Sequence, residues 1–225
     1  YGFGGAALSP APWLIMTHRC LLVQFLQRGE LKTLMFNPTD DVAARKTPFF
    51  ERTIRQFGDY IAFNLLAKRF DSLEHQLAAL GVTRESVDYV AFDHFHTQDF
   101  RGLLGTQDAA HAPRFPNAKL LAQRAEWDDW DDLHPLQRAW YVADGKATVR
   151  TNQVVLLDGD FELGDGVMLL RTPGHTSGNQ TLFVNTPDGI WGSSENGISA
   201  DNWSPHESRI SGLARTGSTK RAVVE

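Results

Sequence analysis

Residues 87–102 read VDYVAFDHFHTQDFRG, and this stretch decides how the rest of the chain is interpreted. Its first six residues are rich in apolar and β-branched side chains, which predicts a β-strand. His94 and His96 stand two apart where this strand is expected to end. Alternate residues of a strand point to the same face, so both imidazoles can converge on one point. Asp99 follows on the loop that leaves the strand, and functional sites are commonly built on such loops.

Residues 167–178, VMLLRTPGHTSG, repeat the arrangement of an apolar strand followed by a histidine. His175 lies in the Pro/Gly turn, which can aim its side chain inward. Three neutral imidazoles with one open position form the ligand set of a catalytic zinc-type site. A lone His-x-His pair is as often two unrelated histidines on the surface or in the core as it is a pair of metal ligands. The second motif, placed again at a strand exit, favours a metal site.

Further strands are expected on both sides of these motifs. Two early strands are separated by a turn at residues 28–30, and the last third of the chain alternates short apolar runs with Pro, Gly and Asp. The expected strands cover residues 21–25, 31–36, 118–122, 153–157, 167–171, 181–184 and 190–192.

Helices are expected between the two groups of strands. One is predicted over residues 48–69, with an apolar face formed by Phe50, Ile54, Phe57, Ile61 and Leu65. A second covers residues 72–80, with a buried stripe of Leu73, Leu77 and Leu80 and a cap at Gly81. Residues 126–144 form an acidic, Trp-rich helical region whose aspartates are expected in solvent. Its tryptophans either pack in the core or line an apolar substrate pocket. The pattern predicts one mixed α/β layered domain over residues 1–225.

Composition excludes several classes of protein. The chain has 225 residues, 42% hydrophobic and 22% charged, which is typical of a globular domain. Its formal net charge of −5 gives no basic surplus for binding nucleic acid. The single cysteine, Cys20, excludes a disulfide framework within the chain. No apolar stretch is long enough for a membrane span, and we expect a cytoplasmic enzyme with a small-molecule substrate. The oligomeric state is not indicated.

Three segments resemble those of the metallo-β-lactamase superfamily. Residues 93–102 resemble its His-x-His-x-Asp-His motif, and residues 170–178 resemble its Pro-Gly-His-Thr-x-Gly segment. Residues 190–195 resemble the following strand, which in the family ends in an aspartate that bridges two metals. The resemblance covers roughly residues 13–205. It implies an αββα sandwich of two mixed β-sheets flanked by helices, with the metal site at one edge.

The chain departs from the family pattern at the second metal. Gln98 stands where the family has aspartate, and Asp99 stands where it has its fourth histidine. If the loop is one residue longer, Asp99 is the family's aspartate and Phe100 replaces the histidine. Glu195 stands in for the bridging aspartate. The family's last histidine has no counterpart after His206, so we expect the domain to be incomplete at its C-terminal end.

The resemblance therefore implies a first metal set and a reduced second one. The first set is His94, His96 and His175, and the second retains only Asp99 and Glu195. Carboxylates in place of imidazoles shift metal preference from zinc towards manganese or iron. We expect one or two divalent ions, with zinc first and manganese or iron as alternatives.

The activity implied is that of a metal-dependent hydrolase. It uses a metal-bound hydroxide on a small ester, thioester, lactone or similar substrate, and Asp99 orients the water or accepts its proton. Two alternatives stay open. The same fold hosts mononuclear-iron oxidoreductases, with two histidines and a carboxylate as ligands. The altered motif also allows a degenerate, metal-free relative with a binding or structural role.

Overall fold

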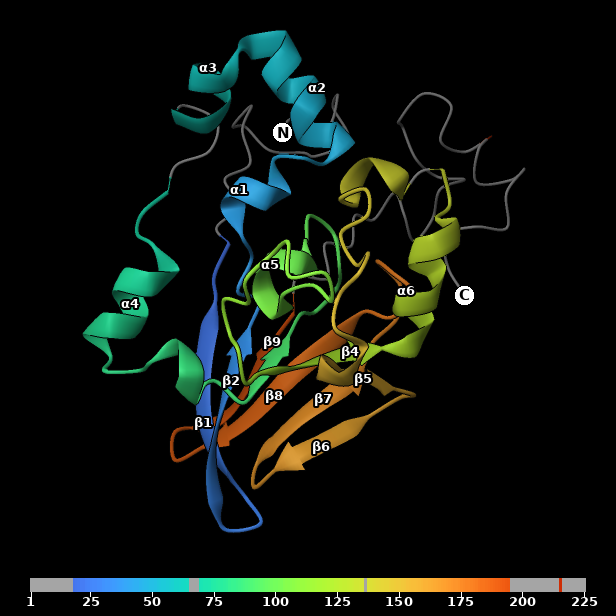
Figure 1. Cartoon of the computed structure of the whole chain (residues 1–225). Helices are drawn as coiled ribbons and strands as arrows, with labels where there is room; N and C mark the ends of the chain where they lie inside the picture. Colours follow the sequence, from blue (N-terminus) through green and yellow to red (C-terminus); the bar gives the residue numbers. More distant parts are fainter. Residues whose placement is uncertain (1–17, 65–68, 136, 195–214, 216–225) are drawn as a thin grey trace, which may run out of the picture.

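A computed structural model describes residues 18–64, 69–135, 137–194 and 215. Its strands form two sheets (Figure 1). The first sheet has the order β1-β2-β3-β4-β5, in which β1 and β2 are antiparallel and the other neighbours are parallel. Its strands are β1 (Leu21–Gln27), β2 (Glu30–Phe36), β3 (Tyr89–Ala91), β4 (Lys119–Gln123) and β5 (Val154–Leu157).

The second sheet has the order β6-β7-β8-β9 and is antiparallel throughout. Its strands are β6 (Phe161–Gly164), β7 (Val167–Arg171), β8 (Gln180–Thr186) and β9 (Gly189–Ser193). Two-residue turns join β6 to β7 and β8 to β9, and such short connections allow only antiparallel pairing. The α/β class and the two sheets expected from the sequence are confirmed. The second sheet differs from the mixed sheet that was expected, and β6 was not foreseen.

Short helices fill the connections. They are α1 (Asp41–Ala44), α2 (Pro48–Phe57), α3 (Asp59–Asn64), α4 (Leu73–Ala79), α5 (Phe100–Leu104) and α6 (Arg124–Asp129). Four 3₁₀ turns accompany them at Arg84–Ser86, Trp130–Asp132, Arg138–Trp140 and Thr151–Gln153. No helix in the described part of the chain has both the length and the apolar character needed to cross a bilayer.

The two faces of the first sheet bury different cores. Val90 and Phe92 point into the core shared with α4 and α5, whereas Ala91 points into the core between the sheets. Leu120 and Leu121 of β4 divide in the same way. This alternation is the period of two that a strand imposes on its side chains. Because both faces of the first sheet are covered, its central parallel strands are apolar over almost their whole length.

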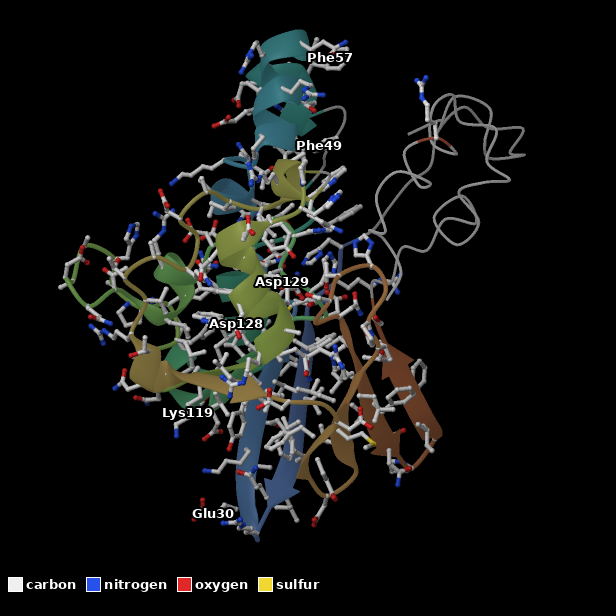
Figure 2. The ribbon with its side chains drawn as sticks, turned by 90° about the vertical axis from the view of Figure 1, so that its right-hand side faces the viewer. Glu30, Phe49, Phe57, Lys119, Asp128 and Asp129 are labelled. Carbon is white, nitrogen blue, oxygen red and sulfur yellow. The ribbon has the colours of Figure 1, made fainter. Side chains whose placement is uncertain are left out.

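The single helix expected over residues 48–69 is wrong. Gly58 ends α2 with a φ of +80°, a conformation that glycine adopts without strain, and α3 starts directly after it. The expected apolar face is not buried as a unit, because Phe57 and Ile61 are 46% and 40% exposed and Leu65 lies outside the described residues. The pair α2–α3 projects away from the sheets, with Phe49 at its near end and Phe57 at its far end (Figure 2).

The helix expected over residues 72–80 is confirmed as α4. Ser72 caps its N-terminus by accepting a hydrogen bond from the amide of His75, and Gly81 follows its end with a φ of +69°. Leu77 is buried, but Leu80 is 65% exposed. The third leucine of the predicted stripe is therefore mostly exposed, because α4 ends at Ala79, one residue before it.

A candidate metal centre at the ends of the strands

The candidate site is assembled where the parallel strands end. Asn37 follows β2, His94 and His96 follow β3, and Glu126 lies in the helix that follows β4. The carboxyl ends of parallel strands meet at one edge of a sheet, which is where α/β folds build their ligand sites. His175 reaches the same place from the second sheet, on the loop between β7 and β8.

Three histidines converge at this edge. His94, His96 and His175 each offer a ring nitrogen, and these nitrogens all lie within 4.8 Å of one another. Each pair of ring centroids is 4.7 Å apart, with interplanar angles of 78° to 89°. His94 and His96 stand on the loop after β3 rather than on the strand itself. The predicted convergence is therefore produced by the loop, not by strand alternation.

A buried carboxylate orients His94. Asp93 accepts hydrogen bonds through Oδ1 from the backbone amide and the Nδ1 atom of His94, each 2.8 Å long. Asn37 donates to Oδ2 of Asp93 at 3.0 Å and accepts from its backbone amide at 3.0 Å. Asn37 itself has a φ of +58°, a strained conformation that asparagine tolerates better than most residues. This pair of residues leaves Nε2 as the ring nitrogen of His94 that can ligate a metal.

One buried carboxylate connects the loop after β3, which carries His94 and His96, to the loop between β7 and β8, which carries His175. Glu126 is 1% exposed and accepts hydrogen bonds from the amide of Phe95 at 2.7 Å and the hydroxyl of Thr176 at 2.8 Å. Phe95 lies between His94 and His96, and Thr176 directly follows His175. Tyr141 donates a third hydrogen bond at 2.7 Å. Burial raises the pKa of Glu126, while His94 and these three hydrogen bonds oppose the rise.

Gly178 allows the second loop to approach Glu126. A Cβ atom at this position would stand 2.5 Å from the Cβ of Glu126 and 2.9 Å from that of Gln123. Real Cβ atoms do not come so close, so any side chain here would push the loop away. The glycine that closes the segment TPGHTSG is thus required by packing around the site.

The histidines suit a divalent cation. Burial, with the neighbouring imidazoles of His94 and His175, holds the pKa of His96 well below its usual value. His96 is therefore neutral, which is the form that binds metal. Its Nδ1 atom lies 3.1 Å from Nε2 of His175. Two imidazole ligands of a tetrahedral zinc with bonds of about 2.0–2.1 Å are themselves about 3.3 Å apart, so this spacing fits.

Asp99 is not part of this group of nitrogens. Its carboxylate caps the N-terminus of α5 through the amide of Arg101 and forms two hydrogen bonds with the Arg101 guanidinium, at 2.9 Å and 2.7 Å. Gln98 donates to Thr39 and to the carbonyl of His96, and its buried Oε1 has no partner in the described part of the chain. Glu195 lies outside the described residues. The roles of Asp99 and Glu195 as ligands, and of Asp99 as proton acceptor, stay predictions.

The Asp99→Asn variant separates these roles. We expect it to lower the free energy of unfolding by about 1–2 kcal/mol, because the amide still caps α5 but loses the charged pair with Arg101. The metal content of the His94 site is expected to equal that of the unmodified chain. Urea unfolding and elemental analysis measure the two quantities.

The matched control is Asp158→Asn, which breaks the exposed pair between Asp158 and Arg124. An exposed pair is worth about 0–1 kcal/mol, so this variant should be close to neutral. Loss of metal in Asp99→Asn, with folding intact, would make Asp99 a ligand and refute the expectation.

The helical region expected over residues 126–144 is reduced to α6 and two short 3₁₀ turns, but its aspartates and buried tryptophan divide between solvent and core as expected. Asp128 and Asp129 are exposed on α6 (Figure 2), and Trp130 is 8% exposed in the core under the first histidine loop. Trp127 stacks on Phe100 at a centroid distance of 6.1 Å. The tryptophan beside the histidines is Trp140, whose ring centroid is 6.1 Å from that of His96.

Several residues that hold the site carry little or no signal in the sequence. Glu126 was hidden in an acidic run, and only its position after a predicted strand distinguishes it from the exposed aspartates. Asn37 directly follows the strand expected over residues 31–36, where nothing else in the sequence marks it. Gln137, which contacts His96 and the His175 loop, lies in the connection between two 3₁₀ turns, where no periodic signal exists. Asp93 directly precedes His94 in the chain, and its carboxylate accepts a hydrogen bond from Nδ1 of His94.

Comparisons with known proteins point to one group. No family model matches the chain. The chain is 28% identical over 131 residues to an N-acyl homoserine lactonase of Bacillus thuringiensis, which covers 57% of the chain and 46% of the relative. It is 30% identical over 123 residues to an N-acyl homoserine lactonase of Rhizobium radiobacter, covering 50% and 41%. The chain thus spans about half the length of the curated relatives that it matches.

A solved structure shares the fold. The chain superimposes on a probable metal-dependent hydrolase of Staphylococcus aureus with a TM-score of 0.52 and 20% identity, covering 72% of the chain and 52% of that structure. At this identity the likeness concerns the fold alone. The sequence similarity to the lactonases comes from a separate comparison and agrees with it. The chain is thus similar in sequence to N-acyl homoserine lactonases and in fold to a probable metal-dependent hydrolase, in line with the resemblance to the metallo-β-lactamase superfamily.

Proposed function

We propose that the chain is the metal-binding part of a metal-dependent hydrolase that opens a lactone ring. The observation that carries the proposal is the convergence of three histidine nitrogens within 4.8 Å at the edge of the sheet. The similarity to N-acyl homoserine lactonases supports the choice of a lactone among the hydrolysable bonds. The same bond type was one of those expected from the sequence.

Zinc is the cation that the donor set favours. Three imidazole nitrogens with a fourth position open are the ligands of a catalytic zinc, whereas mononuclear iron oxygenases use two histidines and a carboxylate. Within the described ranges the group contains no carboxylate, and Asp99, the carboxylate expected as a ligand, is engaged by Arg101. When bound, a divalent cation would supply Lewis acidity that activates water and polarises a carbonyl group.

The chain's own residues prepare the site for that chemistry. Asp93 holds His94 with its Nδ1 atom protonated, and Glu126 keeps the loops of His94 and His175 together. Both carboxylates are buried, so their hydrogen bonds act in a medium with little competing water. The site is thereby fixed before a cation or substrate binds, which is what precise positioning of a reacting bond requires.

The surroundings favour a substrate with an apolar part. Trp140 lies beside His96 and stacks on Phe49 of α2, with ring centroids 4.4 Å apart. Aromatic faces of this kind bind apolar groups, with polar groups at the centre fixing the reacting bond. The acyl substituent of an N-acyl homoserine lactone has this character.

A hydrolysis assay tests the proposal. The zinc-loaded chain is offered an N-acyl homoserine lactone, a penicillin and an acyl thioester, and the proton released per bond cleaved is followed with a pH indicator. We expect turnover of the lactone above that of the other two, lost with a chelator and restored by zinc. Equal or greater turnover of the thioester or penicillin would contradict the choice of lactone. No turnover of any substrate by the zinc-bound chain would reject a hydrolase.

A further inference from the structure

We infer that Gln137 is a positioning residue that sets the tautomer of His96 and so aims its Nδ1 atom at the metal. The inference rests on the proposed metal site and deepens it. Gln137 contacts two of the three histidines. Its Oε1 atom lies 2.5 Å from Nε2 of His96, and its Nε2 atom donates to the backbone carbonyl of His175 at 3.1 Å.

The carbonyl of His175 fixes which way the amide of Gln137 faces. A carbonyl oxygen can only accept a hydrogen bond, so the NH₂ group of Gln137 must point at it. The amide oxygen is then left facing His96. The orientation of the amide follows from chemistry, although the oxygen and nitrogen of an amide are alike in shape.

The orientation of the amide in turn fixes the proton of His96. An amide oxygen cannot donate, so Nε2 of His96 must carry the hydrogen that joins them. A neutral imidazole has one N–H, and its other nitrogen then holds a lone pair. For His96 that nitrogen is Nδ1, which lies 3.1 Å from Nε2 of His175 at the centre of the histidine group. The lone pair is thus presented where a cation binds.

The backbone of Gln137 is held in place for this task. Its amide donates to the carbonyl of His134 at 2.8 Å, and its carbonyl accepts from the amide of Trp140 at 2.9 Å. Trp140 links this segment to the His96 loop, because its carbonyl accepts a 2.7 Å hydrogen bond from the amide of Thr97, the residue after His96. The segment that carries Gln137 is therefore anchored to the loop that it orients, and little conformational freedom remains to be lost on binding.

Three variants separate tautomer control from simple support. Gln137→Met keeps the length of the side chain and removes both hydrogen bonds. Gln137→Glu keeps an acceptor for His96 and loses the donor to His175. Gln153→Met is the matched control, since Gln153 donates to the carbonyls of Pro116 and Ala118 away from the histidines.

Two measurements are made on each full chain. ¹⁵N chemical shifts of the His96 ring in metal-free protein report its tautomer, and competition with a zinc chelator reports affinity. We expect Gln137→Met to populate both tautomers and to bind zinc about 10- to 100-fold more weakly, the usual effect of losing an orienting partner. Gln137→Glu should keep the proton on Nε2 of His96. Its fold-loss of zinc affinity should be less than about one tenth of the loss in Gln137→Met. Gln153→Met should match the unmodified chain in both measurements.

Other outcomes would overturn the inference. A wild-type tautomer and affinity in Gln137→Met would show that the amide positions nothing. An equal loss of affinity in Gln137→Met and Gln137→Glu, with the tautomer unchanged in both, would assign Gln137 to support of the His175 loop. A failure of the unmodified chain to bind zinc would reject the proposed function and the metal role of Gln137 together, whereas the first two outcomes leave the proposed function standing.

Discussion

The His175→Ala variant is expected to lose tight metal binding and, with it, hydrolysis. His175 contributes one of three convergent nitrogens, and its Nε2 atom faces Nδ1 of His96 at 3.1 Å. A zinc site with four ligands is worth about 10–16 kcal/mol, so one ligand accounts for roughly 3–4 kcal/mol, or about 10²- to 10³-fold in affinity. Chelator competition measures the affinity, and the assay with the lactone measures the activity.

A matched histidine provides the control. His75 lies on α4 with an exposed side chain that pairs with Asp71, and it does not belong to the group of three histidines. His75→Ala should keep the metal content and activity of the unmodified chain. Equal metal occupancy in His175→Ala and in the unmodified chain would contradict the assignment of the site.

The second large effect is expected for Glu126→Leu. Leucine fills much of the volume of glutamate but accepts no hydrogen bond, so the amide of Phe95 and the hydroxyls of Tyr141 and Thr176 lose their acceptor. Leaving a buried donor unpaired costs about 1–3 kcal/mol, and the hydroxyls can turn to other partners, so we expect a total loss of about 3–5 kcal/mol. Urea unfolding measures it.

Glu126→Gln distinguishes hydrogen bonding from charge. The amide oxygen can accept from Phe95 and Tyr141, and the amide nitrogen can donate to the hydroxyl of Thr176, which then acts as acceptor. We therefore expect a loss of less than about 1 kcal/mol. Asp128→Asn, on the exposed face of the same helix, should be neutral. A loss in Glu126→Gln as large as that in Glu126→Leu would mean that the charge, not the acceptor, holds the loops.

Local patterns in the sequence were enough to predict most of the strands and the three histidines of the site. The apolar runs that precede His94 and His175 are strands in the structure. The three imidazoles lie together, as the two independent motifs predicted. The strand model for His94 and His96 was nevertheless wrong in detail, because β3 ends at Ala91 and the loop after it turns both rings inward. The pattern located the residues, and the loop supplied the geometry.

Contacts between distant segments could not be read in the same way. Glu126 and Gln137 form hydrogen bonds with residues 31 to 50 positions away in the chain, and apart from the position of Glu126 after a predicted strand, no local pattern separates them from solvent-exposed neighbours. The break between α2 and α3 was missed for a related reason. A glycine is tolerated within a helical pattern, and only the backbone conformation of Gly58 shows that the helix ends there.

We expect above all that His94, His96 and His175 hold a divalent cation. Elemental analysis of the untagged chain tests it most directly, after purification without added metal and again after loading with zinc, manganese and iron. We expect about one tightly bound ion per chain, zinc in preference to the others, and far less than one ion per chain in His175→Ala. No stoichiometric metal under any loading condition, with a melting temperature indifferent to added zinc, would contradict it and favour a metal-free relative.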